Sequence, residues 1–106
     1  MIKVGVTGSN GFIGWHLCRT LELDNTKFVL IDFNRDWFNE TNSLDYFVSK
    51  CDIIVHLASI NRDKNPDLLY KINLELAQSL VDSLFRTKYK GLFIFASSII
   101  ISRSPI

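Results

Sequence analysis

Four short runs of apolar residues are separated by segments in which apolar residues recur every three or four positions. The runs have the length of β-strands and occupy residues 2–7, 27–33, 52–58 and 91–96. The helical spacing occurs in residues 11–23, 43–50 and 66–86. The pattern therefore predicts the order β-α-β-α-β-α-β.

The last of the three helical segments carries clear start signals. Asn65 can cap the helix, Pro66 suits its first position, and Asp67 suits the positive end of the helix dipole. In the second helical segment, Ser43 is the predicted N-cap. The long helix is predicted to bury an apolar stripe of Leu69, Ile72, Leu76, Leu80 and Leu84.

The predicted strands are nearly continuous in apolar residues, which is typical of a parallel sheet covered by helices on both faces. Right-handed crossovers then give a doubly wound α/β fold of the Rossmann type. Counted along the chain, the expected strand order is 2-1-3-4. We interpret residues 1–106 as one domain that holds the N-terminal four-strand portion of this fold.

Composition narrows the class of protein. The 106 residues carry a net charge of +1, which gives no electrostatic footprint for nucleic acid or an anionic membrane. No run approaches the roughly 18 apolar residues needed to cross a bilayer. Cys18 and Cys51 lack metal-ligand spacing and are too few for a disulfide framework. We expect a cytoplasmic protein with reduced thiols and no metal site.

Four of the five glycines lie within the first 14 residues. Three of them, Gly8, Gly11 and Gly14, follow the first strand and open the first helix. This position suits a tight turn, close approach of a pyrophosphate to the backbone, and binding at the helix N-terminus. Asp32 follows Gly14 by 18 residues and is placed to bind ribose hydroxyls. The predicted cofactor contacts at the turn are Gly8, Asn10, Gly11, Phe12, Ile13 and Gly14.

The predicted cofactor is NAD or NADP. Asp32 favours NAD, because its charge would repel a 2′-phosphate. Arg35 could instead pair with that phosphate, but a solvated loop cation is the favoured interpretation of this residue. The sequence leaves this choice open.

Four segments, in the right order, resemble the extended short-chain dehydrogenase/reductases, which include nucleotide-sugar epimerases, dehydratases and reductases. They are TGSNGFIG at residues 7–14, DIIVHLA at 52–58, YKINL at 70–74 and FIFASS at 93–98. The resemblance implies a catalytic role for Ser98. Asn73 lies on the apolar stripe of its helix, where a buried amide needs a partner, so it is predicted to have a structural role or to bridge to the active site and cofactor. Leu57, Ala58 and Ser59 end the third strand, where ligands bind in such sheets. His56 is expected to be a hydrogen-bonded core residue.

Only 20 residues separate Asp32 from Asp52, where typical members carry an additional strand and helix. This short connection and the run HLASINR at residues 56–62 resemble the same region of 4-keto UDP-sugar reductases of the capsular-polysaccharide type. The similarity implies a UDP-sugar substrate and contacts from Asn61 and Arg62 to substrate or cofactor phosphate. A solvated loop is the alternative for these two residues.

The family's catalytic Y-x-x-x-K motif does not follow the fourth strand. Tyr46 and Lys50 have its spacing but precede the third strand. We therefore expect the chain to be the cofactor-binding part of a longer enzyme, inactive alone, with homodimers common among full-length members. The alternative is a non-catalytic module that senses NAD(P).

Overall fold

The computed structural model describes residues 1–58 and 65–95. Its sheet has four parallel strands in the order β2-β1-β3-β4. The strands are β1 (Ile2–Thr7), β2 (Phe28–Ile31), β3 (Ile53–His56) and β4 (Leu92–Phe95). The predicted doubly wound α/β class and the predicted strand order are both confirmed.

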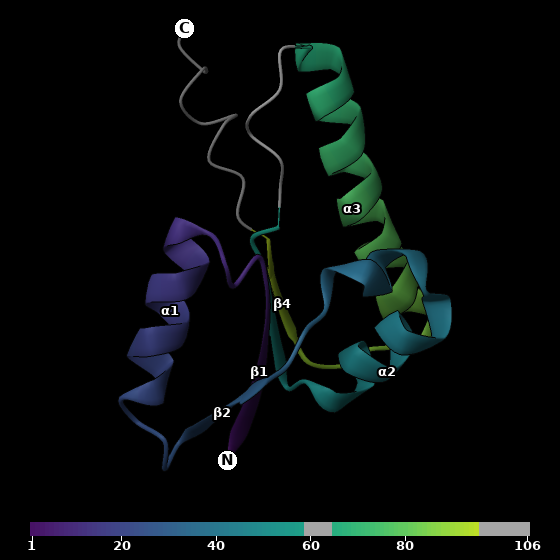
Figure 1. Ribbon diagram of the computed structural model, residues 1–106. Helices are drawn as coiled ribbons and strands as arrows, with labels where there is room; N and C mark the ends of the chain where they lie inside the picture. Colours follow the sequence, from purple (N-terminus) through teal and green to yellow (C-terminus); the bar gives the residue numbers. More distant parts are fainter. Residues whose placement is uncertain (59–64, 96–106) are drawn as a thin grey trace, which may run out of the picture.

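Helices cover the two faces of this sheet. They are α1 (Phe12–Glu22), the short 3₁₀ helix η1 (Arg35–Asn39), α2 (Thr41–Lys50) and α3 (Pro66–Arg86). Figure 1 shows α1 on one side of the strands, and α2 and α3 together on the other. The sheet is therefore the middle layer of three.

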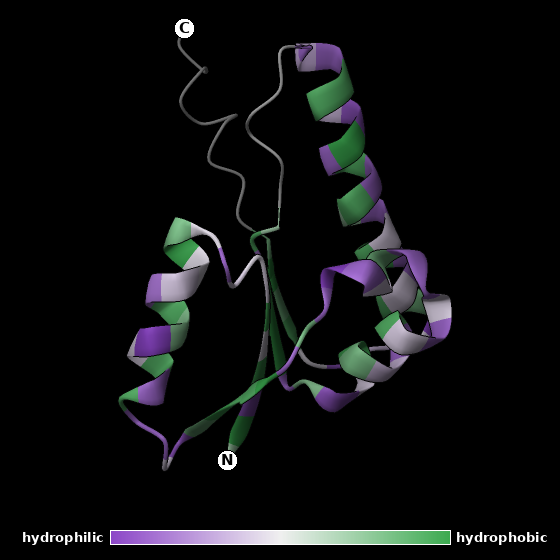
Figure 2. Ribbon diagram, viewed as in Figure 1, coloured by the Kyte–Doolittle hydropathy of each residue, from purple (hydrophilic) through white to green (hydrophobic). Residues whose placement is uncertain are grey.

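Successive side chains of a strand point to opposite faces of the sheet, so each strand contributes to the cores on both sides. Val4 and Val6 of β1 pack with Cys18 of α1. Ile54 of β3 points the opposite way and packs with α2 and α3. In Figure 2 the strands are mostly hydrophobic, whereas the helices alternate between polar and apolar residues. The hydrophobic pattern thus explains why both faces of the sheet are covered.

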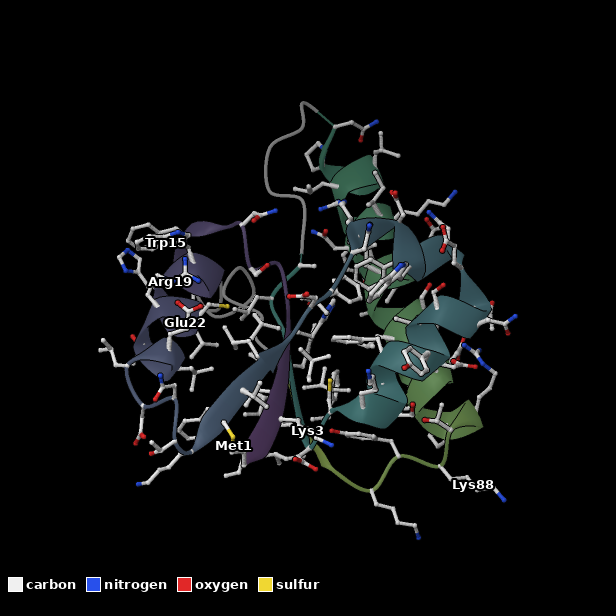
Figure 3. The ribbon with its side chains drawn as sticks, turned by 60° about the horizontal axis from the view of Figure 1, so that its bottom comes forward. Met1, Lys3, Trp15, Arg19, Glu22 and Lys88 are labelled. Atoms are coloured by element: carbon white, nitrogen blue, oxygen red, sulfur yellow. The ribbon has the colours of Figure 1, made fainter. Side chains whose placement is uncertain are left out.

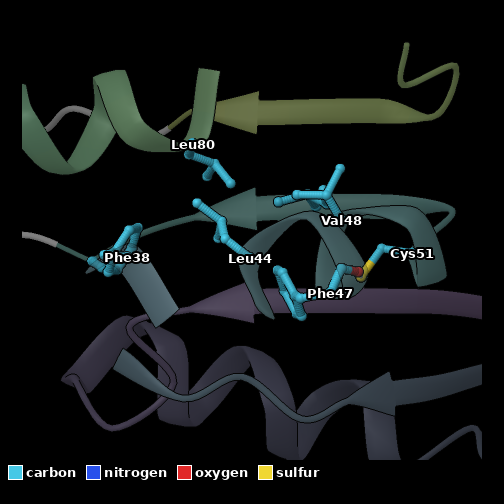
Figure 4. Packing of buried hydrophobic residues seen from close by; sticks show 8 residues of the cluster. Phe38, Leu44, Phe47, Val48, Cys51 and Leu80 are labelled. Carbon is cyan, nitrogen blue, oxygen red and sulfur yellow. The ribbon is translucent and has the colours of Figure 1, made fainter. Parts of the chain in front are cut away.

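The larger core lies between the sheet and α2. Figure 4 shows Leu44, Phe47 and Val48 of α2 facing the strands, with Leu80 of α3 beside them. The packing is close, because a Cβ atom at Gly5 of β1 would lie 2.5 Å from atoms of the Phe47 ring. Gly5 is therefore a small strand residue that lets α2 approach, outside the predicted phosphate turn.

The start of α3 is confirmed, since Asn65 Oδ1 accepts hydrogen bonds from the backbone amides of Asp67 (3.0 Å) and Leu68 (3.2 Å). The prediction that Ser43 caps α2 is wrong. The N-cap residue is Glu40, and the Ser43 hydroxyl donates to Glu40 Oε1 at 3.2 Å. The cause is η1, which leads directly into α2 so that the helix begins at Thr41.

We expect Asp45→Ala to lower the free energy of unfolding by about 2 kcal/mol. Asp45 joins α2 to α3, because its carboxylate accepts hydrogen bonds from Ser83 Oγ at 2.6 Å and Arg86 Nη2 at 2.8 Å. The substitution deprives the fully buried Ser83 hydroxyl of this acceptor. Urea unfolding measures the loss. Arg86→Gln is the control, because it keeps the hydrogen bond from Ser83 and should lower the free energy of unfolding less. Equal losses in the two variants would mean that the ion pair with Arg86, and not the Ser83 bond, provides the stability.

Candidate functional site

The turn between β1 and α1 is built around Gly8. Gly8 has φ +80°, a left-handed conformation that glycine adopts without strain. Its carbonyl oxygen accepts the Gly11 amide at 3.1 Å. A Cβ atom at Gly8 would lie only 2.7 Å from the Ala58 nitrogen, just beyond the end of β3. The turn therefore needs glycine for its conformation and for its contact with the neighbouring strand end.

The N-terminus of α1 is open. Gly11 is the N-cap residue, no side chain caps the helix, and its first turn contains no acidic residue. A Cβ atom at Gly11 would have the Gly8 carbonyl oxygen at 3.4 Å as its one near contact. Free amides at the positive end of a helix, next to open space, form a cradle that suits a phosphate group. The residues present thus fit the pyrophosphate of a dinucleotide.

This turn forms one wall of a cavity of about 310 Å³. The other walls come from the segment after β2, from η1 and from the end of β3. The lining residues are Gly8, Ser9, Asn10, Gly11, Phe33, Arg35, Phe38, Leu57 and Ala58. The structure therefore brings together six of the predicted cofactor residues. Ser9, Phe33 and Phe38 were not assigned to the site from the sequence. The sequence predicts Phe33 as the last residue of the second strand, whereas β2 ends at Ile31, and Phe38 lies in η1, which no hydrophobic period predicts.

Asp32 lines a different hollow. It is exposed and belongs to a groove of about 740 Å³ between α1 and β2. Figure 3 shows Trp15, Arg19 and Glu22 on the α1 side of this groove, with Arg19 Nε 2.6 Å from Glu22 Oε1. Ser9, Asn10 and Phe33 line both hollows. Asp32 thus lines a hollow that shares residues of the turn with the cavity, whereas Arg35 lines the cavity itself.

The remaining predicted residues lie outside both hollows or beyond what the structure describes. Phe12 and Ile13, in the first turn of α1, are 80% and 62% exposed. Gly14 is buried against the backbone of Gly8. Asn73 lies half-buried in α3 and does not line the cavity at the turn. The predicted residues outside the described ranges are Ser59, Asn61, Arg62 and Ser98.

Arg35 is the one cationic residue in the lining of the cavity. It opens η1, whose start is fixed by Asn34 Oδ1 accepting the Asp36 amide at 2.8 Å. Across residues 1–58 and 65–95, the ion pairs involve other residues. The guanidinium charge is therefore available to an anionic ligand in the cavity.

His56, the last residue of β3, is 1% exposed. Its Nδ1 lies 2.7 Å from Thr7 Oγ1, and its ring stacks on Phe95 at 5.5 Å. The prediction of a hydrogen-bonded core histidine is confirmed. Burial lowers the pKa of His56 to about 4. The ring contacts Thr7, Phe38 and Phe95, none of which carries a charge.

We expect stability to fall by about 2 kcal/mol between about pH 7.5 and about pH 5 because of His56. The unfolded chain binds a proton at this histidine near its ordinary pKa of 6.5, whereas the folded protein does so only at about 4. Acidification through this window therefore favours unfolding, and the contribution is complete above it. Urea unfolding at several pH values measures the slope. His56→Asn, which cannot titrate, should flatten it; an unchanged slope would assign the effect to other groups.

Among the described residues, no three histidine, cysteine or acidic side chains cluster to hold a metal ion. No described helix is long and apolar enough to cross a membrane. Cys18 and Cys51 are both buried and unpaired, and burial raises the pKa of Cys51 to about 12.

Comparison with protein families matches residues 4–102 to the NAD dependent epimerase/dehydratase family. The chain belongs to this family.

Among curated proteins, the chain is similar to UDP-2-acetamido-2,6-beta-L-arabino-hexul-4-ose reductase of Pseudomonas aeruginosa. The two are 32% identical over 83 residues, which cover 78% of the chain and 22% of the relative. The chain is 27% identical to D-erythronate dehydrogenase of Haemophilus influenzae, covering 94% and 39%. The structure of RMD from Pseudomonas aeruginosa complexed with NADPH superposes with a TM-score of 0.78 and 26% identity, covering 100% of the chain and 38% of that protein. The chain thus spans less than half the length of each.

Proposed function

We propose that the chain is the NAD(P)-binding part of an oxidoreductase that modifies a nucleotide sugar. The observation that carries this proposal is the cavity in which the Gly8 turn, the open N-terminus of α1 and Arg35 meet. Amides and a cation converging on one cavity suit a ligand with several phosphate charges. The membership of the NAD dependent epimerase/dehydratase family supports this interpretation.

Different residues of the chain would contact different parts of the dinucleotide. The amides at the start of α1 bind the pyrophosphate, and Gly8 and Gly11 give it access to the backbone. Leu57 and Ala58 form the opposite wall, next to the ribose. Asp32 and Arg35 line two hollows that share Ser9 and Asn10, and each would act on the adenosine ribose, Asp32 favouring NAD and Arg35 favouring NADP. The bound cofactor supplies or accepts a hydride.

For the substrate, we propose a UDP-sugar with a 4-keto group, reduced in the synthesis of a surface polysaccharide. The name of the Pseudomonas aeruginosa relative, a UDP-sugar reductase, supports this class. So does the short connection between β2 and β3, which the sequence shares with reductases of the capsular type. Ser98, Asn61 and Arg62 would act on the sugar nucleotide, with Ser98 assisting proton transfer.

A titration with NADH and with NADPH tests the proposed function. Energy transfer from tryptophan to the reduced nicotinamide reports binding, since the chain contains two tryptophans. We expect saturable binding of at least one dinucleotide, displaced by its oxidised form. No binding of either at millimolar concentration would contradict the proposal.

A further inference from the structure

Thr7 and His56 form a buried pair directly beneath the cavity. Thr7 is 0% exposed and His56 is 1% exposed, and neither lines the cavity itself. Besides the bond to His56 Nδ1, Thr7 Oγ1 accepts the amides of Leu57 (3.1 Å) and Ala58 (3.2 Å). The Leu57 amide is shared with the Thr7 carbonyl oxygen, also at 3.1 Å. One hydroxyl thus joins the end of β1 to the end of β3.

The donors and acceptors in this group fix the direction of each bond. A hydroxyl has one proton and two lone pairs, and the two amides approach the lone pairs. The Thr7 proton must therefore go to His56 Nδ1, which has to be unprotonated. The neutral imidazole then carries its proton on Nε2. Burial keeps the ring neutral, because it lowers the pKa of His56 to about 4.

The amides that Thr7 holds belong to the wall of the cavity. Leu57 and Ala58 line it, and Gly8, the residue after Thr7, lines it from the opposite side. The two walls are in contact, since a Cβ atom at Gly8 would lie 2.7 Å from the Ala58 nitrogen. A shift of the Thr7 hydroxyl would therefore change the spacing of the two walls.

The position of the imidazole is itself determined by packing. The ring stacks on Phe95 of β4 with an interplanar angle of 15° and meets the edge of Phe38 at 6.0 Å. Phe38 belongs to η1 and lines the same cavity. His56 is thus held between three elements and offers a single acceptor to Thr7.

We propose that His56 is a positioning residue for the dinucleotide cavity: its Nδ1 accepts the Thr7 hydroxyl proton, and this aims the Thr7 lone pairs at the Leu57 and Ala58 amides. The proposal rests on the proposed function, because it concerns the same cavity. His56 does not touch the ligand. It acts through Thr7 on the distance between the turn and the end of β3.

Two substitutions at His56 separate positioning from stability. In His56→Asn, the amide oxygen takes the place of Nδ1 as acceptor, but the ring contacts with Phe38 and Phe95 are lost. In His56→Leu, apolar bulk remains but the acceptor is gone. We expect the affinity of His56→Asn for the preferred dinucleotide to stay within about threefold of wild type, and that of His56→Leu to fall about tenfold or more, the equivalent of one hydrogen bond. Affinities are measured for the folded fraction, and stability by urea unfolding. If the affinities of the two variants simply rank in the order of their free energies of unfolding, whether or not the acceptor is present, the proposal is overturned.

Thr7→Ser and Thr7→Val form a second pair, which keeps the test decisive if a histidine variant does not fold. Serine retains the hydroxyl and should bind, whereas valine removes it and should lose affinity about tenfold. In Thr7→Val, adding His56→Leu should cost little more; additive losses would overturn the coupling.

Nitrogen NMR of the histidine ring tests the bond without any ligand. The proton is expected on Nε2 at neutral pH; a proton on Nδ1 would overturn the inference while leaving the proposed function intact. If wild type binds neither NADH nor NADPH, the proposed function fails and this inference fails with it.

Discussion

Gly14→Ala is expected to lower the free energy of unfolding by about 3 kcal/mol or more, and to abolish dinucleotide binding with it. A Cβ atom at this position would overlap the Gly8 carbonyl oxygen and lie 2.8 Å from its carbonyl carbon. The atoms that would have to move are backbone atoms of the turn. In an ordinary helix interior, the same substitution would instead stabilise by about 1 kcal/mol. Urea unfolding and the NADH and NADPH titrations measure the two effects.

Gly11→Ala is the matched control. It is the same substitution at the edge of the same helix, but the added methyl group would find a single close neighbour at 3.4 Å. Because alanine is a poorer N-cap than glycine, we expect a loss of at most about 1 kcal/mol. Similar losses in the two variants would mean that α1 and the turn are not as tightly packed as the structure has them.

Much of the fold can be predicted from the sequence, because the local pattern of each segment favours the same helix or strand that it forms in the structure. Within the largely apolar run at residues 52–58, Ile53–His56 become β3, with Ile54 and His56 buried and the two residues that alternate with them half-buried. The start of α3 has its own cap in Asn65, and this helix begins at Pro66 as predicted. Local signals of this kind determine where elements lie, and the crossover rule then orders the strands.

The parts that the sequence did not predict depend on contacts between distant segments. η1 has no hydrophobic period, and it becomes helical where Phe38 is buried in the core. Its presence moved the start of α2 from the predicted Ser43 to Thr41. The role of Thr7 is another case, because a threonine at a strand end has no visible partner until His56, 49 residues away, lies beside it.

Asp32 and Arg35 are close in sequence but line different hollows of the protein. They are three residues apart, and the sequence makes both candidates for the adenosine ribose. β2 ends at Ile31, and the chain then turns into η1, so that Arg35 lines the cavity at the turn while Asp32 lines the groove against α1. The paired titrations with NADH and NADPH measure which of the two cofactors the protein prefers.

Gly11→Asp is expected to abolish dinucleotide binding while leaving the protein as stable as wild type, or more stable by up to about 1 kcal/mol. Gly11 is exposed, its backbone has the extended conformation of an N-cap (φ −76°, ψ 173°), and aspartate is a favoured residue there. The same carboxylate would lie where the pyrophosphate is proposed to bind. Repulsion between these charges should weaken binding of NADH and NADPH about 100-fold or more.

Gly11→Asn separates the charge from the bulk, because its side chain has nearly the same shape and is also a good N-cap. We expect it to bind more weakly than wild type but more tightly than Gly11→Asp, with the difference between the two variants shrinking as salt screens the repulsion. Thermal unfolding of all three proteins checks that their folds are equally stable. Wild-type affinity in Gly11→Asp would place the pyrophosphate away from the N-terminus of α1. That result would leave the fold unchanged and remove the main support for the dinucleotide site, because the open helix end would then have no anionic ligand.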